Sequence, residues 1–103
     1  MDLEFVYNLV KEKRYEWRKH SLARLEERNI RQDEVLEVIL KGEIIENYPQ
    51  NKPFPSCLLF KMVNNRPLHV VISVDKENRR LYIITCYIPT LDKFEPDYKT
   101  RRK

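Results

Sequence analysis

The chain has 103 residues, 42% of them hydrophobic, which is the size and composition of one small domain with a single core. Its only glycine, Gly42, excludes glycine-rich nucleotide loops, and no apolar run approaches the roughly 20 residues that span a bilayer. With a modest net charge of +4, we expect one soluble, cytoplasmic domain over residues 1–103 that needs no cofactor and contacts no membrane.

Apolar residues at helical spacing predict three helices in the first part of the chain. The first begins at about Leu3, where Asp2 can cap it. A short connection through Tyr15–Trp17 leads to a second helix, at about His20–Arg28. The third covers about Gln32–Lys41 and stops at the glycine, although no favoured capping residue stands at its start.

After the glycine, the apolar pattern becomes alternating or continuous, which predicts strands. Four strands are expected: Glu43–Tyr48, Cys57–Val63, Leu68–Val74 and Leu81–Ile88. A proline-rich loop separates the first two, because its three prolines cannot join a ladder. Helices followed by a meander of strands predict an α+β domain, with N-terminal helices packed on a four-stranded antiparallel sheet. Only the basic C-terminal tail, residues 89–103, looks irregular.

Positive charge gathers in two stretches. Residues 11–31 hold eight basic and four acidic side chains, and the last five residues hold four basic ones and none that is acidic. Two basic segments can converge on a polyanion such as RNA. For so small a net charge, a solvated surface with a disordered tail is an alternative that needs no partner.

The second predicted helix carries a stripe of basic residues. His20, Arg24 and Arg28 follow one another at i,i+4 spacing, turned away from the apolar face. An imidazole and two guanidiniums on one side of a helix can bind or process a phosphodiester, since arginine offers paired donors and histidine titrates near neutral pH. The alternative is a surface stripe in which the arginines pair with Glu27 or with other acidic residues.

The second histidine, His69, lies near the start of the most apolar strand. A lone histidine in such a strand is commonly a hydrogen-bonded core residue. The neighbouring strands supply Lys61, Thr85 and Tyr87 as companions for a site. Which of them meets His69 depends on the register of two hairpins, which the sequence leaves open.

No metal site is expected. The two cysteines, Cys57 and Cys86, and the two histidines lack the close spacing that gives two ligands from one turn. The cysteines are better interpreted as small apolar strand residues. No cluster of carboxylates suggests a two-metal nuclease.

The order of several motifs along the chain resembles the domain-of-unknown-function family 4258, which is grouped by similarity with RelE/ParE-like and barnase-like ribonuclease toxins. The motifs are His20–Ile30, Gly42–Glu46, Tyr48-Pro49, Pro53–Ser56, Pro67–Val71, Thr85–Pro89 and Lys99–Arg102. The resemblance covers nearly the whole chain. It departs at Asn29, where glycine is usual, and at Lys61, where glycine is common.

The resemblance implies a RelE-like fold and a metal-independent endoribonuclease, the toxin of a toxin–antitoxin pair. In such an enzyme the RNA 2′-hydroxyl attacks its own phosphorus, which needs a base, an acid and cations. His20 and His69 are the expected base and acid in either order, and Arg24 and Arg28 the expected phosphate clamps. Tyr87 donates a hydrogen bond or stacks on a base.

Further substrate contacts are expected from Lys61, Thr85, Arg101 and Arg102, the last two on flanking phosphates. The expected partners are RNA and a small antitoxin protein, with no DNA. The alternative is a non-catalytic RNA-binding or protein-interaction module of the same fold. In a third interpretation both histidines are structural. The enzyme hypothesis requires that His20, Arg28 and His69 converge on one cleft.

Overall fold

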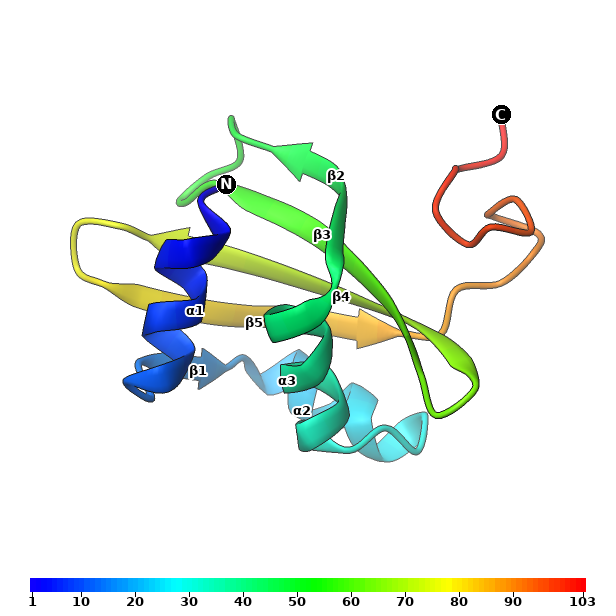
Figure 1. Cartoon of the computed structure of the whole chain (residues 1–103), viewed down its shortest axis with the longest axis horizontal. Helices are drawn as coiled ribbons and strands as arrows, with labels where there is room; N and C mark the ends of the chain where they lie inside the picture. Colours follow the sequence, from blue (N-terminus) through cyan, green and yellow to red (C-terminus); the bar gives the residue numbers. More distant parts are fainter.

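A computed structural model describes all 103 residues as three helices and five strands (Figure 1). In chain order these are α1 (Leu3–Lys11), β1 (Tyr15–Trp17), α2 (Lys19–Glu27), α3 (Gln32–Lys41), β2 (Glu43–Tyr48), β3 (Ser56–Val63), β4 (Arg66–Asp75) and β5 (Arg80–Tyr87). The α+β class is confirmed. The three helices and the four longer strands lie within about two residues of their expected places.

The expected four-stranded, purely antiparallel sheet is wrong. The sheet has five strands in the order β1-β5-β4-β3-β2, and β1 pairs parallel to β5. The residues expected to form a mere connection are the added strand, with Tyr15 opposite Leu81 and Trp17 opposite Ile83. Tyr15 and Trp17 are half-buried and pack against the core, while Glu16 between them is exposed. Three residues are too few to give a periodic signal.

Local side-chain bonds and one close approach fix the helix ends. Asp2 caps α1 by accepting a hydrogen bond from the Phe5 N–H. α3 lacks a favoured capping residue, and the Glu34 carboxylate serves instead by accepting the Arg31 N–H at 2.9 Å. Gly42 ends α3 where a Cβ would lie only 2.4 Å from the carbonyl oxygen of Val38. The chain therefore needs its single glycine at this position.

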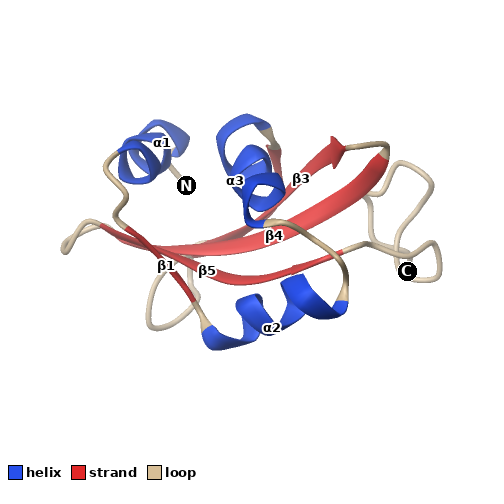
Figure 2. Cartoon of the chain, turned by 90° about the horizontal axis from the view of Figure 1, so that it is seen from below, coloured by secondary structure: helices blue, strands red, loops and turns tan.

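The sheet has two different faces. Leu68, Val70 and Ile72 of β4 point to the core face, where they pack with α1 and α3. His69 and Val71 point to the opposite face, which we call the outer face. Figure 2 shows α1 and α3 on one side of the sheet and α2 on the other, alongside β5. None of the helices is long and apolar enough to cross a membrane.

A β-bulge in β5 decides which of its residues reach the outer face. Val71 pairs with Thr85 and Ile72 pairs with Ile83, so Ile84 is an extra residue. Ile83 and Cys86 are consequently both in the core, while Ile84 and Thr85 are both half-buried on the outer side. Without the extra residue, strict alternation would turn Thr85 inward and Cys86 outward.

The C-terminal segment, residues 89–103, is irregular as expected, but it is not a free tail. Phe94 is 2% exposed and forms an isolated bridge with Arg101. The carboxylate of Asp97 accepts hydrogen bonds from the backbone N–H groups of Lys99 and Thr100. The segment lies at the opposite end of the molecule from α1 (Figure 1) and covers part of the outer face.

Candidate functional site

A hollow of about 580 Å³ lies between α2, the end of β5 and the C-terminal segment. We call it the basic pocket, because four of its ten lining residues are cations. The lining residues are Arg24, Arg28, Thr85, Tyr87, Ile88, Pro89, Thr90, Lys93, Phe94 and Arg101. Three parts of the chain that are distant in sequence therefore build one concave site.

Carboxylates neutralise two of the four cations. Arg24 pairs with Glu27 at 2.6 Å on the surface of α2. Arg101 pairs at 2.7 Å with Glu46 of β2, a hydrogen bond that raises the pKa of the guanidinium. Lys93 and Arg28 have no acidic partner, so the pocket holds uncompensated positive charge.

Arg28 owes its position to the end of α2 and to an open sheet edge. It follows the last helical residue, and its N–H still bonds to the Arg24 carbonyl. Because β1 ends at Trp17, the edge of β5 beyond that point has no partner strand. The Arg28 guanidinium covers this edge by donating to the Cys86 carbonyl at 2.9 Å. A guanidinium has five N–H donors, so others remain for a ligand.

Behind the pocket wall, His69 is 0% exposed. Its ring meets those of Phe60, Tyr87 and Phe94 edge-on, with the Phe94 centroid 4.7 Å away. Nε2 donates to the Tyr98 carbonyl at 2.6 Å, so Nδ1 is left to accept the Tyr87 hydroxyl at 3.2 Å. Burial lowers the pKa of His69 and raises that of Tyr87. The imidazole is therefore neutral and fully hydrogen-bonded.

Five of the nine residues singled out in the sequence line the basic pocket, namely Arg24, Arg28, Thr85, Tyr87 and Arg101. His69 lies behind the wall, and His20 is exposed on α2 outside the lining. Arg102 pairs with Glu95 instead. The expected convergence of both imidazoles with Arg28 is not found, because no imidazole lines the pocket.

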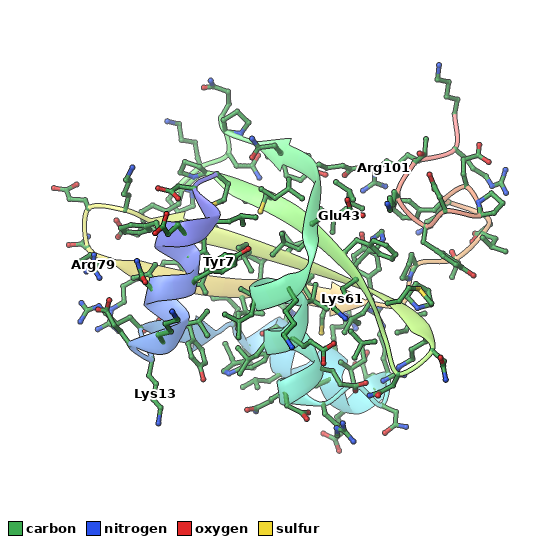
Figure 3. The ribbon with its side chains drawn as sticks, viewed as in Figure 1. Tyr7, Lys13, Glu43, Lys61, Arg79 and Arg101 are labelled. Atoms are coloured by element: carbon green, nitrogen blue, oxygen red, sulfur yellow. The ribbon has the colours of Figure 1, made fainter.

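Lys61 is separated from the pocket by the sheet. It pairs with Leu68, whose side chain is in the core, so Lys61 points to the side of the sheet that carries α3. There its ammonium group pairs with Glu37 at 2.8 Å. Figure 3 shows Lys61 beside α3, away from the segment that carries Arg101.

Register explains which residues meet His69. Phe60 of β3 and Tyr87 of β5 are its cross-strand partners. Sequence reasoning left this register open, and it missed five pocket residues, namely Ile88, Pro89, Thr90, Lys93 and Phe94. The signal available for Phe94 was an aromatic residue in a charged, irregular tail.

Neither cysteine has an exposed thiol. Cys57 and Cys86 are buried on the core face, and burial raises the pKa of the Cys57 thiol to about 11. Nowhere in the chain do three or more histidine, cysteine, aspartate or glutamate side chains gather in a group that could hold a metal ion.

Comparison with known proteins gives one match. The model of the domain of unknown function DUF4258 matches residues 17–88. This stretch runs from the end of β1 to just beyond β5, and it includes α2 and both histidines. No curated protein and no solved structure matches the chain.

Proposed function

The chain belongs to the family of DUF4258 domains, whose description assigns no activity, and we propose from its pocket that it binds single-stranded RNA through a phosphodiester. The uncompensated charge of Arg28 and Lys93 inside a concave site carries this proposal. Guanidinium forks match phosphate oxygens, and a pocket of 580 Å³ is within the usual size range for ligand sites.

Two hydroxyl groups in the same pocket favour RNA over DNA as the ligand. Thr85 and Tyr87 both line it from β5, placed on the outer face by the bulge. A hydroxyl can donate to or accept from a ribose 2′-hydroxyl, the group that distinguishes RNA from DNA. The phenol ring of Tyr87 also offers a face on which a base can stack.

Replacing Lys93 with alanine is expected to weaken RNA binding about tenfold, because it removes one unpaired cation from the pocket. Fluorescence anisotropy with a labelled oligoribonucleotide at several salt concentrations measures the effect. The slope of log affinity against log salt should fall by about 0.7, the value for one phosphate contact on a single strand.

The matched control is Lys61→Ala, which removes the same charge from the other side of the sheet. This variant is expected to bind RNA like the wild type. A DNA oligonucleotide of the same sequence should bind more weakly than the RNA. Equal losses for the two lysine variants would mean that general surface charge, not the pocket, binds RNA.

A second candidate function, metal-independent RNA cleavage, is favoured by the hydrogen bond from Tyr87 to His69. As O2′ attacks the phosphorus and the P–O5′ bond breaks, the 2′-hydroxyl proton passes to the Tyr87 oxygen. The Tyr87 proton passes in turn to Nδ1 of His69. Lys93 gives a proton to the leaving O5′, and Arg28 stabilises the phosphorane charge. His69 then acts through Tyr87, and His20 has no role.

Incubation with RNA in the presence of a metal chelator tests this candidate. The wild type is expected to leave 2′,3′-cyclic phosphate ends, and Tyr87→Phe should lose cleavage while it retains most of its affinity. His20→Ala should cleave normally, since His20 does not line the pocket. If the wild type binds RNA and leaves it intact, the chain is the non-catalytic module.

The RelE-like toxin assignment and its partner, a small antitoxin protein, are part of the proposal and rest on the resemblance of the ordered motifs. The product of an adjoining gene is the candidate partner. Co-purification of the two proteins, and loss of RNA binding in the complex, would support this assignment.

A further inference from the structure

A second hollow, of about 170 Å³, lies on the same outer face as the basic pocket. Its lining includes Arg18, Lys52 and Phe54, and it reaches β5 at Ile84, the residue next to Thr85 of the basic pocket. We propose that this hollow is a subsite for the base and phosphate of a flanking nucleotide in the same RNA strand. The inference rests on the proposed RNA-binding function.

An aromatic platform borders the second hollow. The ring of Phe54 stacks on that of Tyr82 with centroids 5.6 Å apart and planes 13° from parallel. The Arg18 guanidinium lies 4.3 Å from the centre of the Tyr82 ring. Base stacking on such rings is tolerant of sequence, since every base has a π-face. Phe54 is therefore supported as a flat surface next to an open space.

The loop that carries Phe54 is fixed in place. Prolines at positions 49, 53 and 55 restrict its backbone. The Asn51 amide donates to the Ser56 hydroxyl at 2.6 Å, and the Pro55 carbonyl accepts the Val74 N–H at 3.1 Å. A platform already in position loses little conformational entropy on binding, which favours affinity.

Unpaired cations accompany the platform. Arg18 and Lys52 line the hollow and are exposed, and neither forms an ion pair with a carboxylate. The backbone of Arg18 is held at the sheet edge, where its N–H donates to the Ile83 carbonyl at 3.1 Å. An aromatic face beside two free cations suits the base and the phosphate of one nucleotide.

The two sites are spaced for neighbouring parts of one strand of RNA. Tyr82 and Tyr87 are about 15 Å apart at the usual rise of a strand, and both point to the outer face because of the bulge between them. A ligand longer than a dinucleotide is therefore needed to occupy both sites. A dinucleotide in the basic pocket should not depend on Phe54.

The test compares Phe54→Ala with the wild type on a labelled dinucleotide and on an oligoribonucleotide of about ten residues. The longer RNA is expected to bind about tenfold more weakly to the variant, while dinucleotide affinity is unchanged. Phe54→Trp keeps an aromatic face and should bind the longer RNA like the wild type. This rescue separates loss of the ring from a misfolded loop.

Each other outcome overturns the proposed subsite, and the last of them overturns the proposed RNA binding as well. If the wild type binds both ligands and Phe54→Ala keeps its full affinity for the longer RNA, the proposed subsite is wrong, whereas RNA binding by the basic pocket stands. If Phe54→Ala loses the same affinity for both ligands, Phe54 affects binding in the basic pocket and does not form a separate subsite. If the wild type binds neither ligand, the proposed function fails and the subsite fails with it.

Discussion

Replacing His69 with alanine is expected to lower the free energy of unfolding by about 3–5 kcal/mol, the usual cost of truncating a buried aromatic ring. The ring is 0% exposed and packs edge-on against Phe60, Tyr87 and Phe94. Its loss leaves a cavity and removes the partner of the Tyr98 carbonyl, whose orphaned acceptor adds to the cost. Urea denaturation followed by circular dichroism measures the change.

The other histidine is the matched control for this experiment. His20 is exposed on α2, so His20→Ala should change stability by less than about 0.5 kcal/mol. His69→Leu separates the two causes, because it fills most of the cavity but leaves the Tyr98 carbonyl without a donor. Equal effects of the two alanine substitutions would contradict the structural role assigned to His69.

Stability is also expected to fall as the pH drops below 6.5, the ordinary pKa of histidine. Burial lowers the pKa of His69 in the folded state, where its Nδ1 accepts the Tyr87 hydroxyl. Below pH 6.5 the unfolded chain therefore binds a proton that the folded chain excludes. The stability that the neutral His69 contributes is fully present above pH 6.5 and is lost as the pH falls toward the pKa of His69 in the folded state. The free energy of unfolding should fall by up to about 1.4 kcal/mol per pH unit in this window.

Urea curves between about pH 7 and pH 5 measure this slope. Carboxylates affect the pH dependence of stability only at lower pH. Burial alone would raise the pKa values of Glu34 and Glu46, but hydrogen bonds lower them below 4.5. Between pH 7 and pH 5, His69→Leu should reduce the dependence of stability on pH, whereas His20→Ala should leave it unchanged. A wild-type stability that is constant from pH 7 to pH 5 would show that the buried ring is not excluded from protonation.

Residues whose structure depends on local pattern could be predicted from the sequence. The bounds of α3 are those expected, Gln32–Lys41, because an apolar stripe ends at a glycine that the structure requires. The strands after it were recognisable from continuous apolar runs and turn residues. The basic stripe on α2 was also found, and its arginines line the pocket.

Features that depend on long-range contacts could not be predicted. β1 exists because it pairs with a strand more than sixty residues later, which no local window contains. The register that joins His69 to Tyr87, and the bulge that turns Thr85 outward, are set when strands meet. His20 illustrates the limit for the site. It shares a stripe with Arg28, but Arg28 lies eight positions further along the chain, a helical rise of about 12 Å, and the pocket lies at that far end.

The position of β5 between β1 and β4 has a consequence for how the domain is made. The last of the five strands in chain order occupies the interior of the sheet, flanked by partners synthesised before it. Until β5 has been synthesised, β1 has no strand with which to pair, and Arg28 at the end of α2 has no sheet edge to bind. Closure of such distant pairings is slow compared with local contacts. We therefore expect the complete sheet to assemble only after β5 has been synthesised, with the basic pocket completed afterwards.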